Sequence, residues 1–221
     1  MENNVVANRN AESIVYTNKL IRNTYILLSM TLLFSAATAA ISVVLRMPPS
    51  TYLFSIGGAF VLMWFVLPRK ANSSSGIAVV FLITGLLGFS LGPMLNMYLA
   101  LPTGPQIVAT ALGGTGVIFL GLSGYALTTK RDFSFLGGFL FVGILVDLGA
   151  AILNIFMAIP ALSLALSAAI VMLMSGFILF DTSRMVNGGI NNYVIATVQL
   201  YLNIFNLFIS LLHLLGFARN E

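Results

Sequence analysis

Seven long apolar runs occupy most of this sequence and constrain its fold more than any other feature. They cover residues 24–45, 51–67, 77–99, 107–127, 133–157, 162–180 and 196–217. A helix needs about 20 mostly apolar residues to cross roughly 30 Å of hydrocarbon. The runs are continuously apolar rather than alternating, which favours helices over the strands of a membrane barrel. The sequence therefore predicts an all-α integral membrane protein with seven transmembrane helices in residues 24–217.

The composition excludes most other classes of protein. Hydrophobic residues make up 59% of the chain and charged residues 7%, whereas soluble proteins carry about 25% charged residues. There is no cysteine and only one histidine, His213, which excludes thiolate metal sites, cysteine nucleophiles and motifs that need two histidines. We therefore expect no enzyme, no catalytic or metal site and no cofactor. The basic residues lie between apolar runs, so membrane topology explains the net charge of +4 better than nucleic-acid binding.

The basic residues predict how the chain is oriented. With the N-terminus inside, eight lysine and arginine residues lie on the inner side, and only Arg46 and Arg219 lie outside. Positive charge favours the cytoplasmic side, so residues 1–23 are expected to be cytoplasmic and residues 218–221 to form a short periplasmic C-terminus. Residues 1–23 are polar and lack a strong apolar periodicity, which predicts a flexible tail.

Polar residues recur along the last apolar run. They are Gln199, Asn203, Asn206, Ser210 and His213, spaced by four, three, four and three residues. This spacing places them on one helix face, and a polar face is not expected to turn toward lipid. We therefore expect the other six helices to enclose the seventh. The polar face then has two interpretations, which are hydrogen bonds between helices and the lining of an ion path.

Two aspartates are further candidates. Asp147 is the only formal charge within the runs, and a charge near the bilayer centre costs at least about 2.5–3.5 kcal/mol on insertion scales. Asp147 and His213 have similar depths in the membrane, so we expect contact between the fifth and seventh helices. Asp181 directly follows the sixth run, where Asn203 of the seventh could approach it.

One short motif suggests catalysis. The residues Gly121-Leu122-Ser123-Gly124 match the GxSG of rhomboid intramembrane proteases, for which His213 would have to be the base. Ser123 lies near the inner edge and His213 near the outer edge of their helices, whereas a dyad requires about 2.6–3.2 Å between its polar atoms. We therefore expect no dyad.

Glycines are frequent in the third and fourth runs. They include Gly85, Gly88 and Gly92 in the third, and Gly113, Gly116, Gly121 and Gly124 in the fourth. Small residues let helix backbones approach closely in lipid, so we expect these glycines mainly to serve packing.

Several stretches near the C-terminus share a specific pattern with a known family. They are Phe180-Asp181-Thr182-Ser183, Asn187-Gly188-Gly189 and Leu200-Tyr201-Leu202-Asn203-Ile204-Phe205-Asn206. With Thr128-Thr129-Lys130-Arg131-Asp132-Phe133, they resemble the Bax inhibitor-1 family, and the resemblance extends over nearly the whole chain. It implies seven helices with the last one central. It also implies a bacterial inner-membrane protein that binds and restrains FtsH, an ATP-dependent membrane protease, and that is itself a substrate of this protease.

The resemblance also implies an alternative function. Some members of the family are pH-sensitive calcium leaks, in which an aspartate pair between the sixth and seventh helices is the sensor. Asp181 matches the first aspartate, but Asn203 occupies the second position and cannot share a proton as a second carboxylate would. For calcium or proton sensing along the polar face, the candidate residues are Asp181, Asn203, Asn206, Asp147, His213, Gln199 and Ser210.

Overall fold

The computed structural model describes residues 2–218, with side chains from residue 15 onward. The described chain is helical, without strands, and contains seven helices long and apolar enough to cross a membrane, as predicted. They are α1 (Glu2–Val44), the helix Ser50–Lys70, α4 (Ser75–Leu99), α5 (Gly104–Thr129), α6 (Leu136–Met157), α7 (Pro160–Val186) and α8 (Tyr193–Ala218). Of the expected C-terminal segment 218–221, only Ala218 lies among the described residues.

The second span consists of three consecutive pieces. They are α2 (Ser50–Val61), the π-helical segment η1 (Leu62–Val66) and the short α3 (Leu67–Lys70). Pro68 follows the π segment. Proline has no backbone N–H and its ring crowds the carbonyl four residues earlier. A π turn changes the hydrogen-bond register just before this position, and the chain continues as one helical span.

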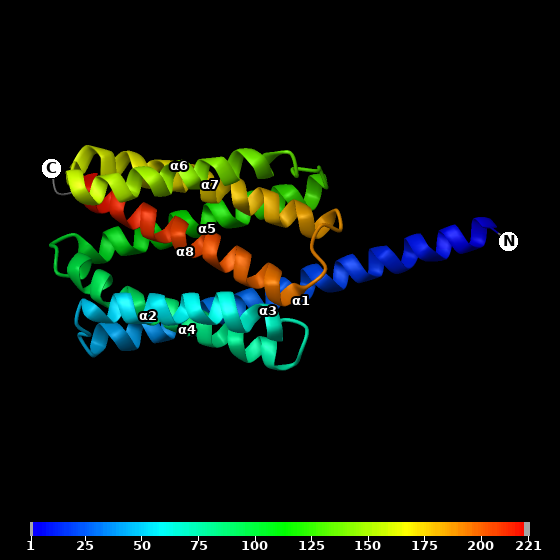
Figure 1. Cartoon of the computed structure of the whole chain (residues 1–221), viewed down its shortest axis with the longest axis horizontal. Helices are drawn as coiled ribbons and strands as arrows, with labels where there is room; N and C mark the ends of the chain where they lie inside the picture. The colour runs from blue at the N-terminus through cyan, green and yellow to red at the C-terminus, as the bar shows by residue number, and fades with distance from the viewer. Residues whose placement is uncertain (1, 219–221) are drawn as a thin grey trace.

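The helices form two layers with α8 between them (Figure 1). One layer contains α1, α2 and α4, and the other contains α6 and α7, whereas α5 lies beside α8 and contacts α4, α7 and α8. Helix α8 contacts α1, α4, α5 and α7, but neither α2 nor α6. The expectation that all six other helices enclose the last one is therefore wrong, because α2 packs on α4, and α6 packs on α7.

Helices α1 and α4 pack closely along a line of glycines, which we call the α1–α4 seam. Carbon atoms added at Gly85, Gly88 or Gly92 of α4 would collide with Phe34, Ser35 or Ser42 of α1. The packing expectation is thus confirmed for the third run. The expectation is not met for four glycines of α5. Apart from α5 itself, nothing lies within 4 Å of a carbon added at Gly113, Gly116, Gly121 or Gly124.

The first helix differs from the expected flexible tail. Helix α1 begins at Glu2 and extends beyond the bundle (Figure 1). The side chain of Leu20 is buried, and the Tyr16 hydroxyl donates to the carbonyl oxygen of Asn191 at 2.7 Å. Tyr16, Leu20 and Thr24 recur every four residues and so lie on one face of the helix. One face of residues 16–23 therefore packs against the bundle.

Candidate functional site

Asp181 of α7 and Asn203 of α8 form a buried pair. The Asn203 Nδ2 atom donates to Asp181 Oδ2 at 2.7 Å, and the two residues are 5% and 7% exposed. The predicted approach of these residues is confirmed. Burying a carboxyl group is costly unless it is hydrogen-bonded, so the amide of Asn203 stabilises Asp181 where the two helices meet.

The residues after Asp181 connect this pair to three other parts of the molecule. The Thr182 hydroxyl lies 3.4 Å from the Tyr25 hydroxyl of α1 and 3.4 Å from the Ser123 hydroxyl of α5. The Ser183 hydroxyl donates to the carbonyl of Arg131 at 3.0 Å and accepts from the N–H of Phe133 at 2.9 Å. One turn of α7 therefore joins α1, α5, α8 and the connection between α5 and α6.

Arg184 follows Asp181 by three residues, but its described contacts are with Gly189 and Phe180. Its Nη2 atom donates to the carbonyl of Gly189 at 3.0 Å, and its guanidinium carbon lies 5.3 Å from the centre of the Phe180 ring. This distance is within the range of a cation–π contact. The arginine thus stabilises the turn after α7. The described hydrogen-bond donor to Asp181 is Asn203.

The predicted polar face of α8 is divided in the structure. Asn203 and Ser210 are buried, at 7% exposure each. Asn206 is exposed, and Gln199 and His213 are partly exposed. The five residues therefore form two lines with a seven-residue spacing, one buried and one accessible. Helix α7 contacts both lines, since Asn203 binds Asp181 and His213 binds Ser167.

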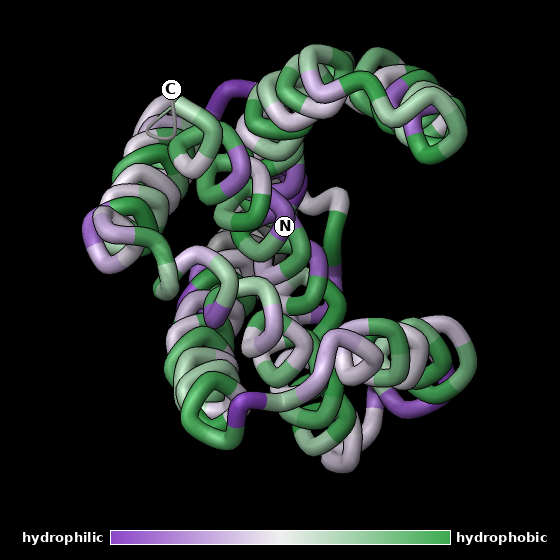
Figure 2. The backbone as a smooth tube through the Cα atoms, turned by 90° about the vertical axis from the view of Figure 1, so that its left-hand side faces the viewer, coloured by the Kyte–Doolittle hydropathy of each residue, from purple (hydrophilic) through white to green (hydrophobic). Residues whose placement is uncertain are grey.

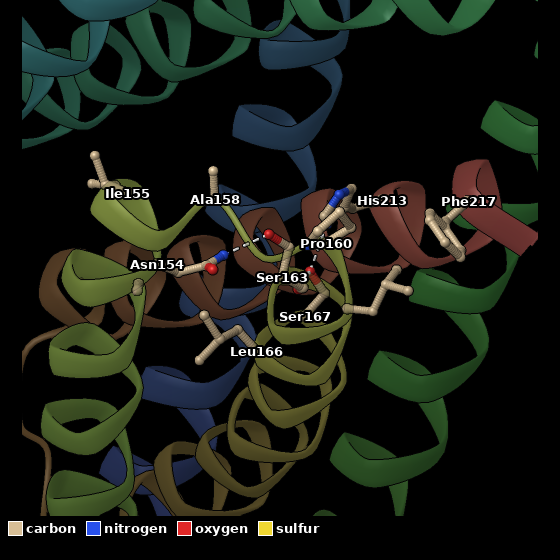
Figure 3. A pocket seen from close by; sticks show the side chains of 11 residues that line it. Asn154, Ile155, Ala158, Pro160, Ser163, Leu166, Ser167, His213 and Phe217 are labelled. Atoms are coloured by element: carbon tan, nitrogen blue, oxygen red, sulfur yellow. Dashed lines mark hydrogen bonds between the residues drawn. The ribbon is translucent and has the colours of Figure 1, made fainter.

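His213 lies at the rim of a pocket between α6, α7 and α8 (Figure 3). The pocket has a volume of about 550 Å³. Its polar contacts are Ser167 Oγ to His213 Nδ1, at 2.7 Å, and Asn154 Nδ2 to Ser163 Oγ, also at 2.7 Å. The histidine therefore binds a serine of α7.

The expected contact between Asp147 and His213 is wrong. Asp147 lies on α6, and α6 does not contact α8, because α7 lies between them. The Asp147 Oδ1 atom is buried and has no hydrogen-bond partner among the described residues. Depth in the membrane gives a position along the bundle axis only, and two helices at the same depth can still lie on opposite sides of a third.

Ser123 and His213 are far apart, as predicted. Ser123 lies beside Thr182, and His213 lies beside Ser167. These two partners are fifteen residues apart on α7, which is about 22 Å at 1.5 Å per residue. A rhomboid-type dyad is therefore not formed. Among the side chains described, no group of three or more His, Cys, Asp or Glu gathers in a way that could hold a metal ion.

Tyr201 forms a polar contact that the sequence reasoning missed. Its hydroxyl is 2.5 Å from Ser35 Oγ of α1 and donates to the carbonyl of Thr84 of α4 at 3.2 Å, and the residue is 1% exposed. It thus connects α8 to both helices of the α1–α4 seam. A tyrosine within an apolar run is itself a signal, because a buried hydroxyl usually finds a partner.

Comparison with known proteins identifies the family. The family model described as inhibitor of apoptosis-promoting Bax1 matches residues 17–220. An uncharacterized membrane protein of Vibrio cholerae is 49% identical over 95% of this chain and 94% of its own. The modulator of FtsH protease YccA of Escherichia coli is 46% identical over the whole of both chains. An uncharacterized protein of Pseudomonas aeruginosa is 44% identical over 91% of this chain and 90% of its own. With its seven apolar helices, this chain belongs to the Bax1-I family of membrane proteins.

Proposed function

We propose that this protein binds and restrains FtsH, a membrane-bound ATP-dependent protease, in the bacterial inner membrane. The observation that carries the proposal is the 46% identity, over the full length of both chains, to a protein named as modulator of that protease. Because the match covers both chains completely, the N-terminal part of α1 has a counterpart in the relative, as do all seven spans.

The proposal places the N-terminus in the cytoplasm. The basic side chains support this orientation, since they gather at the end of the bundle where α1 enters it. They are Lys19, Arg22, Arg69, Lys70, Lys130, Arg131 and Arg184, whereas Arg46 lies in the connection at the other end. Positive charge is retained on the cytoplasmic side.

We also propose that the chain is itself a substrate of FtsH. An ATP-driven protease needs an accessible polar end to grip, and α1 extends from the bundle at the end where the basic residues gather (Figure 1). Seven spans would resist extraction, so a gripped chain would occupy the protease and slow the degradation of other substrates. Restraint and degradation would then be two outcomes of the same engagement.

A deletion of residues 2–14 tests whether FtsH grips the N-terminal part of α1. It leaves the contact of Tyr16 with Asn191 intact and keeps Lys19 and Arg22 for orientation. We expect the shortened chain to be degraded more slowly by FtsH, to co-purify with it as before, and to inhibit it more strongly. The matched control replaces residues 2–14 by a shuffled sequence of the same composition. Degradation of the shortened chain at the rate of the full chain would contradict the idea that FtsH grips residues 2–14, whereas failure of the full chain to co-purify with FtsH would contradict the proposed function.

A second candidate function is a cation leak, favoured by the buried contact between Asp181 and Asn203. These residues match the position at which family members that leak calcium carry their sensor, and the accessible polar line of α8 lies beside them. Calcium flux into liposomes that contain the purified chain tests this function. Flux that depends on pH and is lost in Asp181→Asn would support it, and flux equal to that of empty liposomes would exclude it.

A further inference from the structure

One face of α8 is only partly covered by the other helices. We call it the open face of α8, and its residues recur every three or four positions. They are Ile195, Gln199, Leu202, Asn206, Ile209, His213 and Phe217, all exposed or partly exposed. The two end residues, Ile195 and Phe217, are 37% and 38% exposed, so the face is accessible over nearly the whole length of the helix.

Helices α7 and α4 flank this face. On one side, Asn203 and His213 bind Asp181 and Ser167 of α7. On the other side, Tyr201 binds the carbonyl of Thr84 in α4, and Gly216 packs against Tyr98 of α4. Figure 2, which views the bundle along its long axis, shows that the two layers separate on one side. The open face therefore lies between the contacts of α8 with α7 on one side and its contacts with α4 on the other.

The polar residues of the open face have unused hydrogen-bonding capacity. Asn206 donates only to the carbonyl of Leu202 in its own helix, at 2.9 Å. The Oε1 atom of Gln199 is itself buried and has no hydrogen-bond partner among the described residues. His213 uses Nδ1 for Ser167, and the second nitrogen of its ring has no described partner. These three residues follow one another at intervals of seven, over about 21 Å at 1.5 Å per residue.

Acyl chains cannot satisfy these groups. Polar side chains in membrane helices usually face the interior of a bundle and bind across helices. A repeat of seven residues matches the packing of two helices that cross at about 20°. The apolar residues between the polar ones, Leu202 and Ile209, would supply the close packing that drives helix association in lipid.

We propose that the open face of α8 docks one transmembrane helix of a partner protein, and that this helix presents hydrogen-bonding side chains about seven residues apart. The identity of the partner rests on the proposed function, under which the docked helix belongs to FtsH. The bundle then recognises the protease within the membrane, independently of the N-terminal part of α1.

Site-specific cross-linking tests this assignment directly. The chain has no cysteine, so a single cysteine at Asn206 can be labelled with a photoreactive benzophenone in the full chain. The control is a cysteine at Val117 of α5, which is 74% exposed and, like Asn206, lies thirteen residues after the start of its helix. After co-purification with FtsH and illumination, we expect an adduct with FtsH from position 206 and none from position 117.

Each other outcome of the cross-linking is decisive. Co-purification without an adduct at position 206, or with equal adducts at both positions, overturns the docking assignment and leaves the proposed function intact. An adduct between two copies of this chain identifies a homodimer and also overturns the assignment. Failure of the unlabelled chain to co-purify with FtsH overturns the proposed function and the assignment together.

A substitution gives a quantitative measure of the same contact. Asn206→Leu removes the amide, and Asn206→Gln retains one. In Asn206→Leu we expect FtsH binding to weaken about threefold, the effect of one average hydrogen bond between membrane helices, and up to about eighteenfold. We expect partial recovery in Asn206→Gln. The control is Thr110→Val, since Thr110 is exposed and bonds only to the carbonyl of Gln106 in its own helix. Equal binding by Asn206→Leu and Thr110→Val would overturn the assignment.

Discussion

The substitution Gly88→Ala tests how much of the bundle's stability depends on the α1–α4 seam. A carbon added at Gly88 would collide with the carbonyl oxygen of Ser35, and would lie 2.5 Å from the hydroxyl oxygens of Ser35 and Thr38. The side chains of Ser35 and Thr38 could rotate away, but the carbonyl belongs to the backbone of α1. Relief of the collision therefore requires the two helices to move apart.

The expected magnitude follows from two opposing effects. Overpacking a close contact costs about 1–3 kcal/mol, whereas replacing glycine by alanine within a helix favours the helix by up to about 1 kcal/mol. Gly121→Ala provides the matched control, because an added carbon at Gly121 has nothing within 4 Å. The difference in unfolding free energy between the two variants isolates the overpacking, and we expect it to be about 1–3 kcal/mol.

The assay is reversible unfolding of the purified protein in mixed detergent micelles, followed by circular dichroism. Gly88→Ala should unfold at a lower fraction of denaturing detergent than the natural chain, and Gly121→Ala at the same fraction or a higher one. If the two variants agree within about 0.5 kcal/mol, the usual range of surface substitutions, the seam does not limit stability.

Three further predictions concern the polar residues and the topology. Asn203→Leu should destabilise the bundle by about 1–3 kcal/mol, because it leaves the buried Asp181 without its donor; the double variant with Asp181→Leu should recover most of this loss in the same unfolding assay. Asp147→Leu should improve insertion of α6 by about 2.5–3.5 kcal/mol in a translocon assay, and the absence of a gain would reveal a polar partner for this carboxyl group. A reporter active only outside the cytoplasm should work when fused after Glu221 and fail after Lys70, whereas an active Lys70 fusion would contradict a cytoplasmic N-terminus.

The sequence predicts position along the membrane normal well. Run length and apolar composition respond directly to the thickness of the hydrocarbon, which is why all seven spans could be located. The depth argument also separated Ser123 from His213 and brought Asp181 near Asn203. In each of these cases the conclusion depended on an axial coordinate, which residue counting provides.

Lateral arrangement is harder to predict from residue spacing. The intervals of four and three along α8 define a broad face, but they do not say where a neighbouring helix ends on it. The cover provided by α7 buries Asn203 and leaves Asn206 exposed, although the two residues are less than one turn apart. The same missing information made Asp147 and His213 look like neighbours. The glycines of α5 were likewise indistinguishable from those of α4 until the partner helix was known.

The geometry of α1 has a mechanical consequence. At 43 residues, this helix is about 65 Å long at 1.5 Å per residue, roughly twice the thickness of the hydrocarbon. Tension applied at its first turns acts along the helix axis and therefore parallel to the α1–α4 seam. The contacts at Gly85, Gly88 and Gly92 would then be loaded in shear, together, rather than peeled open one after another. A motor pulling on this end would therefore load the α1–α4 seam as a whole.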